Sequence, residues 1–242
     1  MCGRFTLTWN LNELQGRFGF ITEQTSLEPK YNIAPTDPVL TVINDGRRQG
    51  EMMRWGLIPF WATDPKIGSR MINAAGETAA TKPAFRNAFK KRRCLVLANG
   101  FYEWKKDGKL RTPIYLTLKS GDPMAFAGLW EIWKSPGGKY VHSCTIITTT
   151  PNSLIEPVHN RMPVILSDES EALWLDPSTE DPKVLEPLLI PSPPELMRIE
   201  IVSDYVNSVR NQGPECVVPA ADSSEAVSSK SNSAKNKGRL FD

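Results

Sequence analysis

The sequence of 242 residues has few of the side chains that build metal centres and disulfide frameworks. It contains four cysteines, no two of them in a Cys-x-x-Cys pair, and two histidines. This spacing excludes a structural zinc site and fits a reducing compartment, so we expect no metal and no cofactor. Cys94 and Cys144 lie in apolar, strand-like runs typical of buried small hydrophobic residues, and Cys216 lies in a loop.

The sequence also lacks long apolar runs and a strong excess of charge. No stretch of about 18 apolar residues is present, and the first residues lack the basic-then-apolar layout of a secretory signal. We therefore expect a cytoplasmic protein with no membrane partner, monomeric by default. Hydrophobic residues make up 40% and charged residues 23%, which excludes a wholly disordered chain. The net charge of +2 argues, taken alone, mildly against a nucleic-acid partner.

Strand-like runs dominate, and no regular series of long helices separates them. This pattern predicts an α+β fold, a single domain over residues 1–219 with a curved, mostly antiparallel sheet. Helices are expected at residues 8–18, 82–91, 153–156, 168–175 and 182–189. Strands are expected at residues 39–43, 52–57, 94–98, 114–118, 124–130, 140–149, 163–166 and 197–202.

The composition changes near Pro219. Residues 220–242 are rich in Ser, Lys, Asn and Ala, which predicts a disordered tail. The tail carries an apolar pair, Leu240 and Phe241. We favour no role for this pair; the alternative is a short motif that docks onto a replication clamp.

One segment has a strong local excess of positive charge. Residues 78–102 contain no carboxylate and six basic residues, between Glu77 and Glu103. Such a run is typical of a phosphate-contacting face, although charge alone favours the simpler alternative, a solvated helix face. The basic residues are Lys82, Arg86, Lys90, Lys91, Arg92 and Arg93.

Cys2 is unusual because of its position. A small residue at position 2 normally allows removal of Met1, which would leave Cys2 with a free α-amine beside its thiol. Such a 1,2-aminothiol condenses with an aldehyde to a Schiff base, and the thiolate then closes a five-membered thiazolidine ring. Position alone favours the simpler interpretation, a cysteine in a frayed terminus.

Other residues have chemistry suited to proton transfer or base stacking. Glu103 stands among aromatic residues, an environment that raises a carboxyl pKa, although a single Glu between aromatics is more often a surface residue of an alternating strand. His159 is a loop histidine beside Arg161, and Asn73 follows apolar residues at an expected strand end. Trp55, Phe60 and Trp61 have rings suited to stacking on unpaired bases.

Six separated motifs, in this order, resemble the SRAP family, the SOS response-associated peptidases. They are Met1-Cys2-Gly3-Arg4-Phe5, Tyr31-Asn32-Ile33-Ala34-Pro35, Trp55-Gly56-Leu57-Ile58-Pro59, Ile72-Asn73-Ala74 with Glu77-Thr78, Asn99-Gly100-Phe101-Tyr102-Glu103-Trp104 and His159-Asn160-Arg161-Met162-Pro163. The resemblance covers about residues 2–219 and implies a partly barrel-like fold surrounded by short helices.

The resemblance also implies a function. Family members shield abasic sites in single-stranded DNA through a covalent crosslink, with lyase and peptidase-like side activities in the DNA damage response. Its catalytic residues would be Cys2, Asn73, Glu103 and His159. Its DNA contacts would come from Arg4, Asn32, Pro35, Phe60, Trp61, Arg86 and Arg161. Association with the nucleoid would follow from DNA binding.

One residue departs from the family pattern. Many members carry Arg after the Asn-Ala pair, where this chain has Ala75. A phosphate contact at that position is therefore missing, or moved to Arg70 or Lys82. We expect the change to affect DNA affinity more than chemistry.

Two rival functions use the same residues. The first is an N-terminal-nucleophile or cysteine hydrolase, with Glu103 or His159 as base, which would turn over a peptide. The second is a non-covalent binder of single-stranded or modified DNA, which would not need Cys2. A stoichiometric adduct with an abasic site distinguishes the crosslinking function from both.

Overall fold

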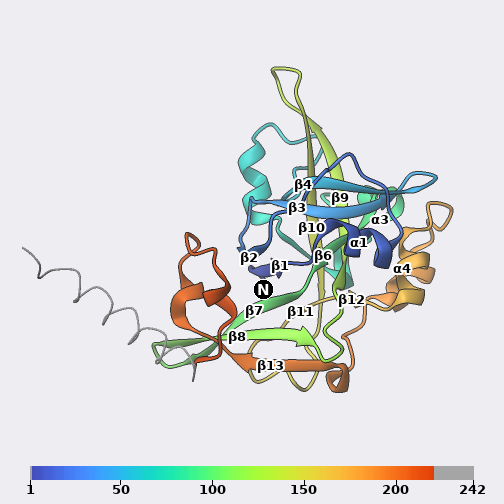
Figure 1. Cartoon of the computed structure of the whole chain (residues 1–242). Coiled ribbons are helices and arrows are strands. Elements are labelled where there is room, and N and C mark those ends of the chain that lie inside the picture. Colours follow the sequence, from blue (N-terminus) through green and yellow to red (C-terminus); the bar gives the residue numbers. More distant parts are fainter. Residues whose placement is uncertain (1, 221–242) are drawn as a thin grey trace, which may run out of the picture.

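The computed structural model describes residues 2–220 of the chain (Figure 1). Met1, Leu240, Phe241 and nearly all of the expected tail lie outside the described residues. Within residues 2–220, no helix is long and apolar enough to cross a bilayer.

A closed five-stranded barrel forms the core. The pairings run from β10 through β4, β3, β6 and β9 and return to β10. All these pairings are antiparallel except that of β10 with β4. The strands are β3 (Pro38–Asn44), β4 (Arg48–Trp55), β6 (Arg93–Ala98), β9 (Met124–Lys134) and β10 (Tyr140–Thr149). Closure leaves these strands without free edges, and the expected α+β fold with barrel-like sheets is confirmed.

A second, open sheet packs against the barrel. Its antiparallel order is β13, β8, β7, β1, β2. These strands are β13 (Met197–Ile201), β8 (Leu110–Leu118), β7 (Gly100–Asp107), β1 (Phe5–Leu7) and β2 (Lys30–Ile33). Phe5 joins the two layers, because its ring packs edge-on against Trp55 and Phe126. The ring centroids lie 5.0 Å and 5.9 Å from that of Phe5.

Short helices surround the sheets. Helix α1 (Leu11–Phe18) begins at an Asn10–Glu13 capping box and buries Leu11, Leu14 and Phe18. The α-helices α2 (Gly76–Ala79), α3 (Arg86–Lys91), α4 (Asp168–Leu175) and α5 (Pro182–Leu185) follow. The 3-10 helices are η1 (Pro65–Arg70), η2 (Glu186–Leu188), η3 (Pro194–Leu196), η4 (Asp204–Asn207) and η5 (Pro214–Val217).

Several expected elements differ from the structure. The helix expected at residues 153–156 was wrong, because the segment forms turns there. The strand expected at 163–166 is split into β11 (Met162–Pro163) and β12 (Ile165–Leu166), and the helix expected at 82–91 begins only at Arg86, where α3 starts. The sequence patterns missed β1, β2, β5 (Asn73–Ala75) and β7, three of which are too short to show clear alternation.

The segment between β4 and β5 leaves the barrel and returns to it. Both strands pair in parallel with β10, β4 at Ser143–Cys144 and β5 at residues 146–148. Residues 56–72 therefore form an excursion beside one barrel strand. Gly56 and Gly68 hold it closed: Gly56 has φ +124°, and a Cβ on it would lie 2.6 Å from the Gly68 carbonyl oxygen.

Gly56→Ala should therefore destabilise the protein. The substitution combines a strained backbone with a backbone clash, so we expect a loss of at least about 2 kcal/mol in the free energy of unfolding. Urea denaturation measures the loss. Gly46→Ala is the matched control, because Gly46 has φ +113° but a Cβ on it would meet no atom beyond its chain neighbours within 4 Å. An equal loss in both variants would show that the approach of Gly68 has no importance.

Candidate functional site

The N-terminal strand brings Cys2 beside Glu103. β1 pairs with β7 at Phe5 and Phe101, and the Tyr102 N–H donates to the Arg4 carbonyl at 2.9 Å. These bonds continue the antiparallel pairing toward Cys2 on one strand and Glu103 on the other. Both side chains are buried, at 0% and 3% exposure.

Asn73 fixes the first described residue of the chain. It opens β5 opposite Ile146 of β10, and its Nδ2 donates to the Cys2 carbonyl oxygen at 2.9 Å. The Asn73 Oδ1 atom is buried and accepts no hydrogen bond from any residue of the described chain. A buried acceptor without a donor is costly, so this oxygen suits a donor supplied by a ligand.

Burial sets the protonation of the two central groups. It raises the pKa of the Cys2 thiol well above its usual range, and the negative charge of Glu103 raises it further. Burial also raises the pKa of Glu103 to about 7. The thiol is therefore neutral near pH 7, whereas the carboxyl group is available both as an acid and as a base.

His159 and Arg161 reach the same end of the barrel through β11. His159 Nδ1 lies 3.0 Å from the Arg161 backbone nitrogen, whose N–H donates to it in one tautomer, and 3.2 Å from the Arg161 carbonyl oxygen. Burial lowers the pKa of His159 and favours its neutral form. The Arg161 guanidinium makes a bidentate ion pair with Glu77, at 2.6 and 2.9 Å, and donates to the Thr148 carbonyl at 2.5 Å.

The roles of Glu77 and Thr148 were not recognised in the sequence. Glu77 lies in α2, and Thr148 of β10 pairs with Ala75 of β5. Hydrogen bonds from Arg161 lower the pKa of Glu77, so the pair is charged at neutral pH. The only sequence feature that pointed to this ion pair is the carboxylate of Glu77, four residues after Asn73.

Arg4 and Asn32 are largely occupied by internal contacts. Asn32 is 0% exposed, and its Nδ2 donates to the carbonyls of Val206, Ser208 and Asn211 at 3.2, 2.9 and 2.9 Å. Its Oδ1 accepts from Arg4 at 2.6 Å. Asn32 therefore has no surface for the DNA contact expected from the sequence and instead holds the 206–211 loop.

Arg4 keeps part of its surface. It is half-buried, donates to the Val206 carbonyl at 3.1 Å and lies over the Trp104 ring at 5.6 Å. Burial lowers the pKa of its guanidinium. These contacts hold the Arg4 guanidinium in place, two residues along the chain from the buried Cys2.

Of the three rings named for stacking, Phe60 and Trp61 are accessible, whereas Trp55 is buried in the core and cannot stack on a base. Phe60 and Trp61 are 55% and 49% exposed at the start of the 56–72 excursion. Pro35 is half-buried in the turn after β2, where Thr36 adopts φ +80°. That conformation is costly for a β-branched residue and is typical of turns held rigid by their surroundings.

The six basic residues of the 78–102 run divide into two groups. Arg93 is 5% exposed and donates to four carbonyls at the ends of α3 and α4, and Arg92 pairs with Glu131 at 2.8 Å. These two arginines are structural. The other four are exposed: Lys82, Arg86, Lys90 and Lys91.

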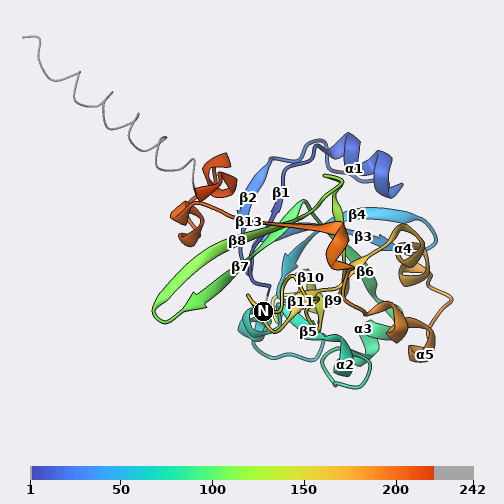
Figure 2. The ribbon, with the colours of Figure 1, turned by 90° about the horizontal axis from the view of Figure 1, so that it is seen from below.

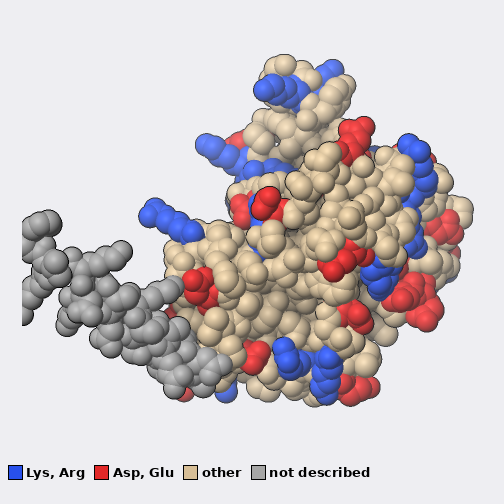
Figure 3. All heavy atoms as spheres, in the orientation of Figure 1, with Lys and Arg blue, Asp and Glu red and all other residues tan. Residues whose placement is uncertain are grey.

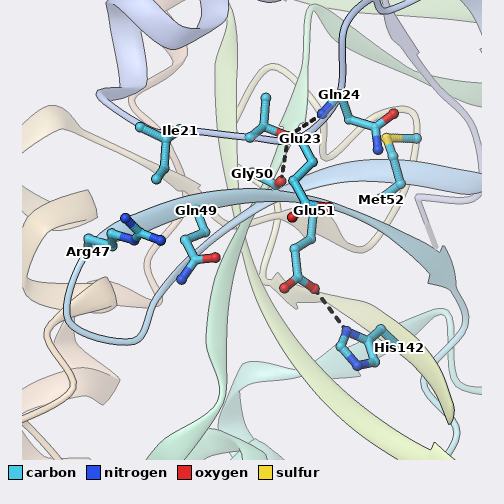
Figure 4. A pocket seen from close by; sticks show the side chains of 10 residues that line it. Ile21, Glu23, Gln24, Arg47, Gln49, Gly50, Glu51, Met52 and His142 are labelled. Atoms are coloured by element: carbon cyan, nitrogen blue, oxygen red, sulfur yellow. Dashed lines mark hydrogen bonds and ion pairs between the residues drawn. The ribbon is translucent and has the colours of Figure 1, made fainter.

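The other histidine belongs to a different surface. His142 Nδ1 lies 2.9 Å from Glu51 Oε2, in a polar hollow of about 420 Å³ that also contains Gln24, Arg47 and Gln49 (Figure 4). None of the expected catalytic residues lines it. Residues 2–220 contain no group of three or more His, Cys, Asp or Glu side chains that could hold a metal ion.

Charges of both signs are interspersed on the face that Figure 3 shows, with no wide area of one sign. This distribution agrees with the net charge of +2. Any polyanion is therefore expected to meet local basic segments and not a uniformly basic surface.

Comparison with known proteins gives consistent matches. The family described as SOS response associated peptidase (SRAP) matches residues 1–209. Abasic site processing protein YoqW of Bacillus subtilis is 47% identical over 222 residues, covering 90% of this chain and 99% of YoqW. Abasic site processing protein HMCES of Xenopus tropicalis is 31% identical, covering 78% and 66%. A crystal structure of a Bacteroides thetaiotaomicron protein has a TM-score of 0.83 at 27% identity, covering 89% and 98%.

Asn32→Ala should destabilise the 206–211 loop. The substitution removes the Asn32 hydrogen bonds to three carbonyls, of which that of Val206 still accepts from Arg4. At about 1 kcal/mol for each hydrogen bond, we expect a loss of about 2 kcal/mol or more in the free energy of unfolding. Limited proteolysis should cut this loop faster. Gln212→Ala, which removes an exposed amide that donates to the Asn32 carbonyl, is the control and should change stability by less than about 0.5 kcal/mol. Unchanged stability of Asn32→Ala would show that its hydrogen bonds do not hold the 206–211 loop.

Glu103→Gln should change how stability depends on pH. The folded pKa of about 7 lies above the ordinary value of 4.5, so the folded state binds the extra proton and loses stability as pH rises through this window. Relative to Glu103→Gln, the free energy of unfolding of the unmodified protein should fall by about 3 kcal/mol between about pH 4.5 and pH 7. Urea denaturation at several pH values measures the difference; a constant difference would mean that Glu103 is ionised throughout.

Proposed function

Because the chain belongs to the SRAP family, we propose that it processes abasic sites in single-stranded DNA by a covalent crosslink through Cys2. Loss of Met1 would expose the Cys2 α-amine. The supporting observation is the convergence of Cys2, Asn73 and Glu103, with the Asn73 amide bonded to the Cys2 carbonyl at 2.9 Å. The crosslink would shield the lesion during the DNA damage response.

The proposed chemistry has two bond-forming steps on one carbon. The α-amine attacks the aldehyde carbon C1′ of the ring-opened sugar and releases one water to give a Schiff base. The thiolate then attacks the same carbon, forms the C–S bond and returns the electron pair to nitrogen, which closes a thiazolidine ring. Because the thiol is neutral at the start, a neighbouring base has to accept its proton.

Glu103 is the proposed proton acceptor and donor. Its pKa of about 7 allows it to give a proton to the departing water and to take one from the thiol. The unpartnered Asn73 Oδ1 would accept a hydrogen bond from the α-amine or a sugar hydroxyl. The two side chains would thus hold and protonate opposite parts of the opened deoxyribose.

His159 is proposed to assist sugar opening. In the tautomer whose Nδ1 accepts the Arg161 N–H, the proton lies on Nε2 and suits donation to the sugar oxygen. Since a Schiff base at C1′ also permits β-elimination of the 3′ phosphate, we expect weak lyase activity. Arg4, Arg86 and Arg161 would contact phosphates, and Pro35, Phe60 and Trp61 would stack or wedge at the lesion.

Peptidase-like autoprocessing is the second proposed activity. The matched family is described as a peptidase, and the only peptide bond that this mechanism needs to break is Met1–Cys2. The buried, neutral Cys2 thiol is a poor nucleophile toward external peptides, which favours autoprocessing over a general hydrolase. Reversal of the crosslink would use the same groups in the opposite direction.

The crosslink can be tested directly. Purified protein incubated with a single-stranded oligonucleotide carrying one abasic site should give a band that resists denaturation, with the mass of a chain that starts at Cys2. Cys2→Ala should abolish the band, because both the amine geometry and the thiol are needed for the ring. Cys216→Ala is the matched control, removing another buried cysteine, and should crosslink normally.

Two results would contradict the proposal. A band of equal intensity from Cys2→Ala would assign the bond to another residue. Full activity of a protein with an uncleavable extension before Cys2 would show that the α-amine is not required. Turnover of a peptide by the unmodified protein, without any DNA adduct, would instead support the hydrolase.

A further inference from the structure

Beyond residue 104, the β7–β8 hairpin leaves the body of the protein. β7 pairs with β1 only at residues 100–101, and β8 pairs with β13 only at residues 114–118. Residues 105–112, here called the basic hairpin, pair only with each other, in the register Lys105 with Thr112 and Lys106 with Arg111. Figure 2 shows this ribbon projecting from the open sheet.

The basic hairpin has no apolar contact that would explain its shape. Residues 105–111 are all exposed, and its one large hydrophobic residue, Leu110, is 65% exposed. A two-stranded ribbon on its own is marginally stable in water. Its length therefore suggests that a partner lies along it.

Its charge identifies the kind of partner. The hairpin carries Lys105, Lys106, Lys109 and Arg111 against a single carboxylate, Asp107. Within the described chain, none of these four cations forms an ion pair. Four unpaired cations on one extended ribbon complement a polyanion whose charges repeat along a line, such as a phosphate backbone.

The hairpin is continuous with the candidate site. Glu103 is followed after one residue, Trp104, by the first lysine, and Trp104 carries the stacked Arg4. Burial lowers the pKa of His159, and the positive charge of Lys106 lowers it further. The hairpin and α3 project on opposite sides of β11 in Figures 1 and 2.

We propose that the basic hairpin binds the backbone of single-stranded DNA on the side of the lesion opposite to α3. This inference rests on the proposed function, because it takes the DNA through the Cys2 site. The exposed cations of α3 and the 56–72 excursion would hold one flank of the lesion, and the hairpin would hold the other. The site would thus require DNA on both sides of the abasic residue for full affinity.

A pair of charge-neutralising substitutions tests the proposal. In a Cys2→Ala background, which prevents covalent capture, Lys105→Gln/Lys106→Gln should weaken binding of an intact single-stranded oligonucleotide about tenfold at low salt. The slope of log affinity against log salt should become shallower by about 1.4, or 0.7 for each lost phosphate contact. Fluorescence anisotropy measures both. Lys105→Arg/Lys106→Arg keeps the charge and should bind normally.

The β9–β10 hairpin provides the matched control. Lys134→Gln/Lys139→Gln also removes two exposed lysines from a projecting ribbon and should leave affinity within about twofold. An equal loss in both pairs would mean that only net charge matters, and no loss in either would mean that the lysines merely protect a strand edge from aggregation. Either result overturns the proposal.

A second measurement separates this inference from the proposed function. With Cys2 present, oligonucleotides that carry DNA on only the 5′ or only the 3′ side of the abasic site are compared at limiting protein. Lys105→Gln/Lys106→Gln should slow adduct formation with one polarity and not with the other. Equal rates for both polarities, with normal adduct yields, would overturn the hairpin proposal while leaving the crosslink intact. Absence of any adduct, with the affinity loss preserved, would do the reverse.

Discussion

The structure depends on holding one end of the chain in a fixed position. Chain termini normally fray because few hydrogen bonds restrain them, yet Cys2 is fully buried and its carbonyl is bound by Asn73. β1 is paired on both sides, with β2 and β7, and Phe5 inserts between Trp55 and Phe126. Contacts with the core thus offset the conformational entropy that is lost when these first residues are ordered. Side chains at this end of the chain are therefore positioned as accurately as side chains inside a strand.

The basic side chains of the protein divide between structural and exposed positions. Arg93, Arg92 and Asn32 serve the fold, closing helix ends or holding a loop from the interior. Exposed cations gather on α3 and on the basic hairpin, and others are scattered over the surface. The proposed covalent crosslink would need little electrostatic contribution to affinity, and a near-neutral net charge keeps non-specific binding of polyanions weak.

Much of the fold was predictable from the sequence, and the site less so. The long strands follow from apolar runs, and the helices expected at residues 8–18 and 168–175 correspond to α1, which begins at Leu11, and to α4. Barrel closure was not predictable from residue patterns alone, because β10 pairs with strands nearly a hundred residues away in sequence. Asn32 was misjudged for a related reason: only the folded chain brings the 206–211 loop to it. Glu103 was the opposite case, since its aromatic neighbours already indicated a raised pKa.

The 56–72 excursion has a consequence for how this architecture can vary. Since the strands on either side of it lie parallel to the same barrel strand, its length does not set the register of any pairing. Insertions or deletions there would leave the barrel unchanged, while altering the aromatic surface that carries Phe60 and Trp61. A laboratory redesign of this one segment could therefore change the aromatic surface without altering the residues packed around Cys2.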